Sequence, residues 1–179
     1  MQRGVNYWKT YAPVVGWAAV RLLLFVASVN KIPTRSIDFV LAFPQAGTSL
    51  YGTTGRFQSR KCSFEERLCF EGSENLYGLK NASLNWFEKL KQGLEERNFR
   101  QSNIDSCIFI RDNCVILVYV DDCIIISQDM KVIDRFIKSM QDGKEKFILT
   151  DDVDLARFLR FEIEYKKDGS IIMTQSHLI

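Results

Sequence analysis

The chain has 179 residues, enough for one domain with a sizeable core, and 46% of them are hydrophobic and 26% charged. This balance, with 12% aromatic residues, excludes a disordered or low-complexity protein. The formal net charge of +2 gives no overall signature of nucleic-acid binding, although residues 1–35 contain five basic residues and no acidic one. That basic end is suited either to face phosphates or to form an ordinary solvated surface.

The five cysteines and the single histidine argue against several kinds of site. The cysteines lie at positions 62, 69, 107, 114 and 123 without Cys-x-x-Cys spacing, and His177 stands near the C-terminus. This pattern fits reduced thiols in an intracellular protein better than a disulfide framework or a zinc site. Histidine-based nucleophilic catalysis is also disfavoured.

The first predicted element is a helix in the apolar stretch from Pro13 to Val29. Pro13, Gly16 and Arg21 interrupt this stretch, and the apolar run after Arg21 is too short to cross a bilayer. We therefore expect a buried helix over residues 16–30, with no signal peptide and no membrane anchor.

A strand is expected next, over residues 35–43. Alternation along this strand places Asp38 on the opposite face from Ile37 and Phe39. Residues 44–75 then contain four glycines and no clean periodicity. Because they lack an apolar face whose burial would offset the entropy of ordering, we expect them to be the least ordered internal part.

The second half of the sequence alternates helices with strands. Residues 83–98 have helical periodicity, and Asp129 is placed to cap a second helix with an i, i+3, i+4, i+7 apolar stripe. Strands are expected over residues 104–110 and 115–126, and residues 158–165 and 170–174 are expected to form a hairpin. The apolar stripe of the helix that Asp129 caps consists of Ile133, Phe136, Ile137 and Met140. Intermixed helices and antiparallel strands predict an α+β fold.

The most informative segment runs from Val115 to Ile126. Asp121 and Asp122 stand side by side between two apolar, β-branched stretches, which predicts a hairpin with the acids at its turn. Adjacent like charges repel each other, and Asp-Asp lacks the glycine that a tight hairpin turn favours. A divalent cation such as magnesium would relieve this repulsion, since hard cations choose oxygen ligands. The alternative is an ordinary solvated turn.

Asp38 is the best candidate for a third carboxylate on a neighbouring strand. Two metal ions about 3.5–4 Å apart, held by carboxylates, activate an attacking oxygen and stabilise a leaving one in phosphoryl transfer. Spacing in the sequence does not establish that Asp38 and Asp121 meet. The convergence of Asp38, Asp121 and Asp122 is therefore a prediction.

Several motifs, in order, resemble those of one known family. Tyr119-Val-Asp-Asp122 after an apolar strand resembles the catalytic motif of reverse transcriptases, and the chain as a whole resembles the reverse transcriptase of copia-type (Pseudoviridae-like) retrotransposons. The other motifs that carry the resemblance are Thr10-Tyr-Ala-Pro-Val-Val15 with Arg21-Leu-Leu-Leu24, Asp38-Phe-Val-Leu-Ala-Phe43, Leu76-Tyr-Gly-Leu-Lys-Asn-Ala82 with Trp86, and Phe158-Leu-Arg-Phe-Glu-Ile163.

The resemblance implies a polymerase palm, an antiparallel sheet that bears the acids and is backed by helices, with the fingers incomplete and the thumb absent. It implies two Mg²⁺ ions held by Asp38 and Asp121. Asp122 would be the third carboxylate, which tunes the site or contacts a metal ion indirectly. The backbone carbonyl of Phe39 would also face a metal ion.

The resemblance implies further roles in nucleotide binding. Phe43 corresponds to an aromatic steric gate that selects deoxynucleotides, with a plain core phenylalanine as the alternative. Gly78 would let the backbone approach the incoming nucleotide, because glycine has no Cβ. Lys80 would contact phosphate or remain solvated, and Tyr77, like Trp86, is a core residue or a platform for a base.

The primer strand would be contacted by Tyr119, Leu159 and Arg160. Arg160 stands where the family carries glycine, and Asn81 replaces the usual glutamine, so both positions depart from the pattern. Little of residues 44–75 matches the family, which suggests either a frameshifted insert or a divergent loop. The family's basic fingers segment would lie before Met1, and no thumb or ribonuclease H region follows Ile179, so we expect a fragment with little activity.

Three functions are compatible with the sequence. The first is the palm of an RNA-directed DNA polymerase from a copia-type element, acting in the cytoplasm or in a virus-like particle. Its partners would be an RNA or DNA template with a primer, deoxynucleoside triphosphates, and the remaining polyprotein with its integrase and ribonuclease H. The second is an inactive relic that at most binds nucleic acid. The third, from the acidic residues alone, is a two-metal nuclease.

Overall fold

The computed structural model describes residues 11–46, 82–143, 145–152, 157–158, 161–166 and 171–174. Four helices and nine strands lie in these ranges. The helices are α1 (Trp17–Val29), α2 (Ala42–Gln45), α3 (Ala82–Glu95) and α4 (Met130–Asp142). The strands are β1 (Thr34–Phe39), β2 (Arg100–Gln101), β3 (Ile108–Arg111), β4 (Cys114–Tyr119), β5 (Asp122–Ser127), β6 (Leu149–Asp152), β7 (Arg157–Phe158), β8 (Phe161–Tyr165) and β9 (Ile171–Thr174).

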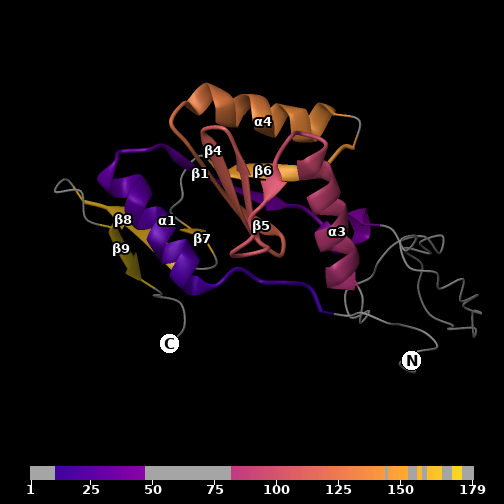
Figure 1. Cartoon of the computed structure of the whole chain (residues 1–179), viewed down its shortest axis with the longest axis horizontal. Coiled ribbons are helices and arrows are strands. Elements are labelled where there is room, and N and C mark those ends of the chain that lie inside the picture. Colours follow the sequence, from indigo (N-terminus) through magenta and orange to yellow (C-terminus); the bar gives the residue numbers. More distant parts are fainter. Residues whose placement is uncertain are drawn as a thin grey trace, which may run out of the picture.

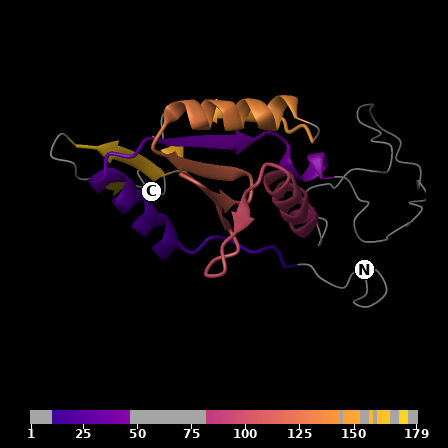
Figure 2. The same ribbon diagram turned by 45° about the horizontal axis from the view of Figure 1, so that its top comes forward.

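Six of the strands form one antiparallel sheet in the order β2-β3-β4-β5-β1-β6, and β7, β8 and β9 form a second. In the larger sheet, β1 lies between β5 and β6 although it precedes both by more than 80 residues. Figures 1 and 2 show α4 and α1 on opposite sides of this sheet, with β8 and β9 near α1. The predicted α+β class is confirmed for the described residues.

The centre of the larger sheet is apolar because both of its faces are covered. Every residue of β5 after Asp122 is buried, and so are Ile116, Leu117 and Val118 of β4. On α4 the predicted stripe of four apolar residues is buried, and the Asp129 carboxylate accepts a 2.9 Å hydrogen bond from the Lys131 backbone N–H. The expected helix cap at Asp129 is therefore confirmed.

The C-terminal ends of α3 and α4 are joined by Arg97. Its guanidinium donates 2.6 Å hydrogen bonds to the Gly93 carbonyl of α3 and to the Ser139 carbonyl of α4. Both carbonyls lie near the C-terminal ends of their helices, and the Ser139 carbonyl also accepts a 3.0 Å hydrogen bond from the Gly143 backbone N–H. These hydrogen bonds fix α3 relative to α4. The position of α3 is important because this helix reaches the end of the sheet that carries the aspartates.

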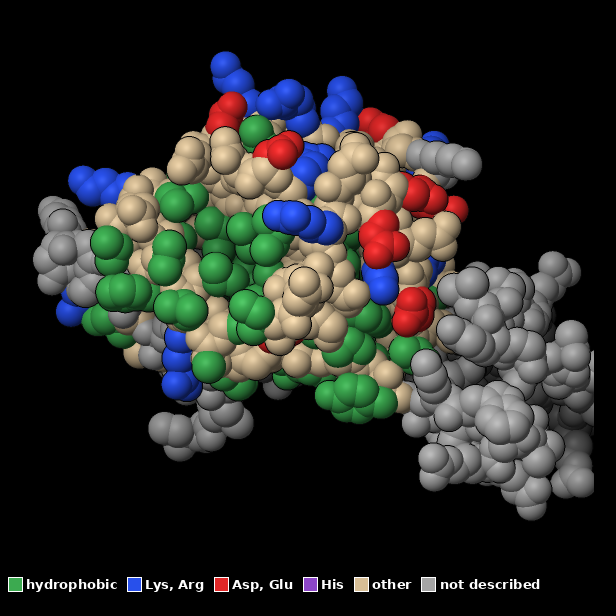
Figure 3. Space-filling model, viewed as in Figure 1, with side chains coloured by type: hydrophobic (Ala, Val, Ile, Leu, Met, Phe, Trp, Pro, Cys, Tyr) green, Lys and Arg blue, Asp and Glu red, His purple; other side chains and the backbone are tan. Residues whose placement is uncertain are grey.

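The helix expected over residues 16–30 is present as α1, but the expectation that it is buried is only half right. Val20, Leu24 and Ala27 are buried, whereas the side chains of Leu22 and Phe25 are 61% and 64% exposed. Figure 3 shows hydrophobic side chains gathered where α1 lies in Figure 1. Among the described helices, none has the length and apolar character needed to cross a membrane.

Several expected strands have different bounds. The strand expected over residues 35–43 ends at Phe39, because Leu41 adopts a left-handed conformation with φ of 52° and α2 follows. The strand expected over residues 104–110 begins only at Ile108, and the one expected over 158–165 is divided into β7 and β8. The predicted pairing of β8 with β9 is confirmed.

Some expectations fall outside the described residues. Pro44 and Gln45 belong to α2, whereas residues 47–81 are not described, so the expected lack of order in this segment stays a prediction. Of the cysteines, those at positions 107, 114 and 123 are free and buried, as reduced thiols should be.

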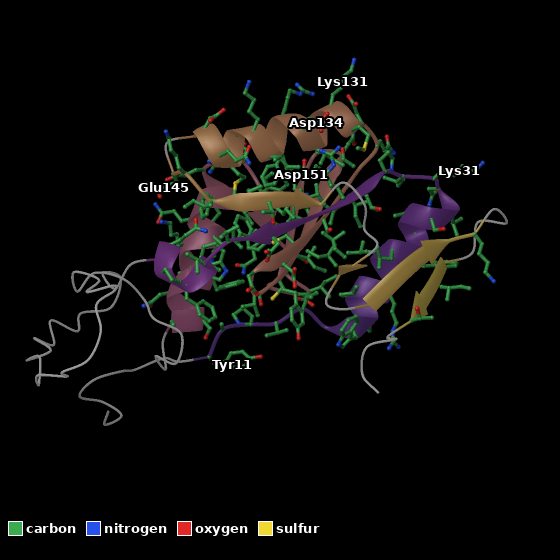
Figure 4. The ribbon with its side chains drawn as sticks, turned by 180° about the vertical axis from the view of Figure 1, so that it is seen from behind. Tyr11, Lys31, Lys131, Asp134, Glu145 and Asp151 are labelled. Carbon is green, nitrogen blue, oxygen red and sulfur yellow. The ribbon has the colours of Figure 1, made fainter. Side chains whose placement is uncertain are left out.

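The basic residue Arg35 is part of the folded core. It is 8% exposed, and its Nη1 lies 2.6 Å from Asp134 Oδ1 of α4 and 3.3 Å from Asp151 Oδ2 of β6. Figure 4 shows Asp134 and Asp151 on these two neighbouring elements. This arginine joins helix to sheet and is therefore engaged with carboxylates, which corrects the expectation that it belongs to a basic surface.

Candidate metal centre

The turn between β4 and β5 carries the two adjacent acids. Tyr119 pairs with Asp122, so Val120 and Asp121 form a two-residue hairpin loop. Sequence reasoning placed both acids at the turn, whereas Asp122 is the first residue of β5. Val120 has a φ of 57°, which is the conformation that a two-residue hairpin turn requires but which a β-branched residue rarely adopts. Such strain is often found beside functional sites.

Asp38 lies on the strand next to this turn. In the pairing of β1 with β5, Asp38 is directly opposite Asp122, although 122 − 38 = 84 positions separate them in the sequence. Directly opposite residues of antiparallel strands have Cα atoms about 4.5–5.5 Å apart and side chains on the same face. Two carboxylate-bearing residues therefore stand side by side at this end of the sheet.

Asp121 is attached to the same place through its backbone. Its carbonyl oxygen accepts a 2.9 Å hydrogen bond from the Phe39 N–H, one residue beyond Asp38. The ladder between β1 and β5 thus continues into the turn. The fold brings the backbones of Asp38, Asp121 and Asp122 together, and all three residues are partly exposed.

The carboxylates do not form a closed cage. Within the described residues, no three His, Cys, Asp or Glu side chains gather into a group that could hold a metal ion. Mg²⁺ in phosphoryl-transfer enzymes is usually bound by one or two carboxylates together with water and substrate phosphates. An open, partly exposed arrangement of carboxylates from neighbouring strands fits that chemistry, because it supplies hard oxygen donors and leaves positions for phosphate oxygens.

The remaining described candidates lie near this end of the sheet. Phe39 is 2% exposed and belongs to the core, so the expected contact of its backbone carbonyl with a metal ion stays a prediction. Phe43 is partly buried on α2 and packs against the core, which fits both of its expected roles. Tyr119 is partly buried, with its ring centroid 6.5 Å from that of Trp17. The other candidates, Tyr77, Gly78, Lys80, Leu159 and Arg160, lie outside the described residues.

Comparison with known proteins decides the family. The family model of the reverse transcriptases (RNA-dependent DNA polymerases) matches residues 1–179. The chain belongs to this family. The reverse transcriptase family typically uses Mg²⁺, in agreement with the donors described above.

The relatives identify the kind of transposable element from which similar domains come. The reverse transcriptase domain is 27% identical over 185 residues to the retrovirus-related Pol polyprotein from transposon RE1 of Arabidopsis thaliana, and 28% identical over 175 residues to that from transposon RE2. These alignments cover 98% and 93% of the chain. The Pol polyprotein from transposon TNT 1-94 of Nicotiana tabacum is 20% identical over 74% of the chain. The domain is thus homologous to copia-type retrotransposon Pol polyproteins, as the motifs indicated.

The domain spans only 12% of the length of the RE1 and RE2 polyproteins. No solved structure matches it.

Proposed function

We propose that this domain is the palm of a magnesium-dependent RNA-directed DNA polymerase of a copia-type retrotransposon. The observation that carries the proposal is the register of β1 against β5, which sets Asp38 opposite Asp122 and joins the Phe39 N–H to the Asp121 carbonyl. Carboxylates on neighbouring strands at a sheet end are the donors that nucleotidyl transfer with two metal ions needs. Membership of the reverse transcriptase family supports the same conclusion.

In the proposed reaction, the primer 3′-hydroxyl attacks the α-phosphate of a deoxynucleoside triphosphate and pyrophosphate leaves. Two bound Mg²⁺ ions would supply Lewis-acid activation of the hydroxyl and neutralise charge on the phosphates. Asp38 and Asp121 would hold these ions, and Asp122, which is paired opposite Asp38, would tune the electrostatic field of the site. The rigid β1–β5 ladder keeps the carboxylates in place, so that little reorganisation accompanies the reaction.

The proposal assigns the other candidates to the substrates. Phe43 selects deoxynucleotides by excluding a 2′-hydroxyl, and Gly78 and Lys80 contact the incoming nucleotide. Tyr119 and Arg160 contact the primer strand.

Further candidates complete these surfaces. Tyr77 belongs with the nucleotide contacts and Leu159 with the primer contacts. The partners are a primed RNA or DNA template, deoxynucleoside triphosphates and the rest of the Pol polyprotein with its integrase and ribonuclease H.

The proposal is tested by incorporation of dTTP on poly(rA)/oligo(dT) in the presence of Mg²⁺. We expect low but measurable extension by the purified chain, abolished in Asp121→Asn and retained in the matched variant Asp112→Asn, whose acid is exposed at the β3–β4 turn. Extension that is unchanged in Asp121→Asn would overturn the metal role. Hydrolysis of the nucleic acid without incorporation would indicate a two-metal nuclease, and metal binding without either reaction would indicate a relic.

A further inference from the structure

The indole of Trp86 contacts the turn that carries the acids. Trp86 stands on α3, is 1% exposed, and its Nε1 donates a 2.6 Å hydrogen bond to the Val120 carbonyl oxygen. Val120 is the first residue of the two-residue turn, and Asp121 is the second. The turn is therefore held from outside the sheet by a donor on a helix.

The same indole packs against the neighbouring strand. Its ring centroid lies 5.1 Å from that of Phe39, at an interplanar angle of 66°, and Phe39 follows Asp38 directly. Phe147 is the third ring of this cluster, and its centroid lies 6.0 Å from that of Trp86 and 5.7 Å from that of Phe39. Edge-to-face contacts of this kind fix ring orientation as well as burial. Trp86 thus contacts both segments that carry the candidate metal ligands.

The turn needs such support on physical grounds. Asp121 and Asp122 are adjacent like charges, and Val120 has a backbone conformation that costs a β-branched residue free energy. In the absence of a cation, both effects favour rearrangement of the turn. A directional hydrogen bond to the Val120 carbonyl opposes that rearrangement, because the carbonyl orientation fixes the peptide that leads into Asp121.

We propose that Trp86 is a positioning residue, which holds the Val120–Asp121 turn against the Asp38 end of β1 so that the carboxylates serve one metal site. The inference rests on the proposed function, since it concerns the same carboxylates. The indole N–H and the indole ring then have different roles. The ring fills the core, and the N–H fixes the orientation of the Val120 carbonyl in the turn. Trp86 acts through the turn and touches neither metal nor nucleotide.

The test separates the N–H from the ring. Trp86→Phe retains an aromatic ring and removes the donor, and benzothienylalanine at position 86 retains the bicyclic shape while sulfur replaces N–H. Phe87→Leu is the matched control, because Phe87 is the next residue of α3 and packs against Phe109 of β3 instead of the turn. Binding of Mn²⁺ to the full chain is followed by electron paramagnetic resonance, together with hydrogen exchange of the Phe39 amide that donates to Asp121.

Both position-86 variants should bind Mn²⁺ roughly three- to tenfold more weakly, the range expected for one net hydrogen bond, with faster exchange of the Phe39 amide. Phe87→Leu should lower thermal stability and leave both readouts near those of the parent chain. Equal Mn²⁺ affinity in the position-86 variants and in Phe87→Leu would overturn the inference while the metal site stands. Failure of the parent chain to bind Mn²⁺, or binding unchanged in Asp121→Asn, would overturn the proposed function and this inference with it.

Discussion

The guanidinium of Arg35 and the carboxylate of Asp134 form an ion pair between β1 and α4, with Nη1 and Oδ1 2.6 Å apart. The two ends differ in environment, since the Arg35 side chain is 9% exposed and that of Asp134 is 56% exposed. Asp151 of β6 adds a second carboxylate at 3.3 Å. The acids therefore compensate a buried positive charge, whereas the acids themselves retain contact with water.

This asymmetry predicts that removing the acids costs more than removing the arginine. Asp134→Asn with Asp151→Asn leaves an uncompensated buried charge and should lower the free energy of unfolding by about 3–5 kcal/mol. Arg35→Met should cost less, because the carboxylates can hydrate and the methionine retains apolar contacts. Urea denaturation measures both. A larger loss in Arg35→Met would show that the pair is stabilising by its attraction and not by compensation of the buried charge.

Gly93 on α3 should resist a substitution that usually stabilises helices. Replacing glycine by alanine inside a helix is ordinarily favourable by about 1 kcal/mol. A Cβ at position 93 would lie 2.6 Å from two ring atoms of Phe147, which is 2% exposed and enclosed by aromatic rings. Gly93→Ala should therefore lower the free energy of unfolding by about 1–3 kcal/mol.

A double-mutant cycle can check whether the contact with Phe147 causes this loss of stability. If the clash with Phe147 is responsible, Gly93→Ala should cost less in a Phe147→Leu background than in the parent chain. Equal costs in the two backgrounds, measured by thermal unfolding, would contradict the contact. Gln92→Ala, at an exposed position on the same helix, serves as the control and should have little effect.

Val120 should be a position where a polar residue stabilises the fold. Its φ of 57° belongs to the left-handed region, which costs a residue with a Cβ roughly 1–2 kcal/mol and which asparagine tolerates. Val120→Asn should raise the free energy of unfolding by about 1 kcal/mol. Val115→Asn, on extended backbone of β4, should lower it. A loss of stability in Val120→Asn would mean that packing of the valine outweighs its strain.

The three buried thiols predict a decline of stability at alkaline pH. Burial raises the pKa of Cys107 to about 12 and that of Cys114 to about 11, from an ordinary 9.0. Burial, with the charges of Asp122 and Asp121, also raises the pKa of Cys123. The unfolded chain loses these protons near pH 9 while the folded chain keeps them, so stability is complete below pH 9 and falls as pH rises toward 12.

The measurement is the free energy of unfolding in urea between pH 8 and pH 10.5. Cys114→Ala should decline less steeply than the parent chain, because one thiol no longer titrates. The comparison of slopes separates the thiols from lysine and tyrosine residues that titrate in the same range. Identical slopes would show that Cys114 does not contribute.

The sequence pattern correctly predicted the helices and hairpins that are determined by residues close together in the chain. The apolar stripe of α4 and its cap are set by residues between Asp129 and Met140, and the β4–β5 hairpin is set by two apolar runs with a short turn. The exact turn was missed because Val120 adopts a conformation that its own preferences oppose. In that case tertiary contacts, including the Trp86 hydrogen bond, override local propensity.

Long-range pairing was the part that the residues alone could not supply. Nothing in the sequence near Asp38 encodes its partner 84 positions later. Its convergence with the hairpin acids was predicted from the needs of two-metal chemistry and from resemblance to a family, and the spacing of the acids could not establish it. Strand β6 was missed because Leu149-Thr-Asp-Asp152 has no apolar alternation and is held by its pairing with β1 at the sheet edge. The partners of Arg35 were missed for the same reason, since they come from α4 and β6.

The central claim is that Asp38 and Asp121, with Asp122 as the third carboxylate, form the metal site at the end of β1 beside the β4–β5 turn. Its most direct test is titration of the ¹⁵N-labelled chain with Mn²⁺, whose paramagnetism broadens nearby amide signals. The amides of Asp38, Phe39 and Asp121 should broaden first. Those of Cys114 and Ser127, paired at the other end of the hairpin and about 17 Å away, should persist longer. Broadening that begins instead beside Asp134 and Asp151, or that is uniform along β5, would contradict the claim.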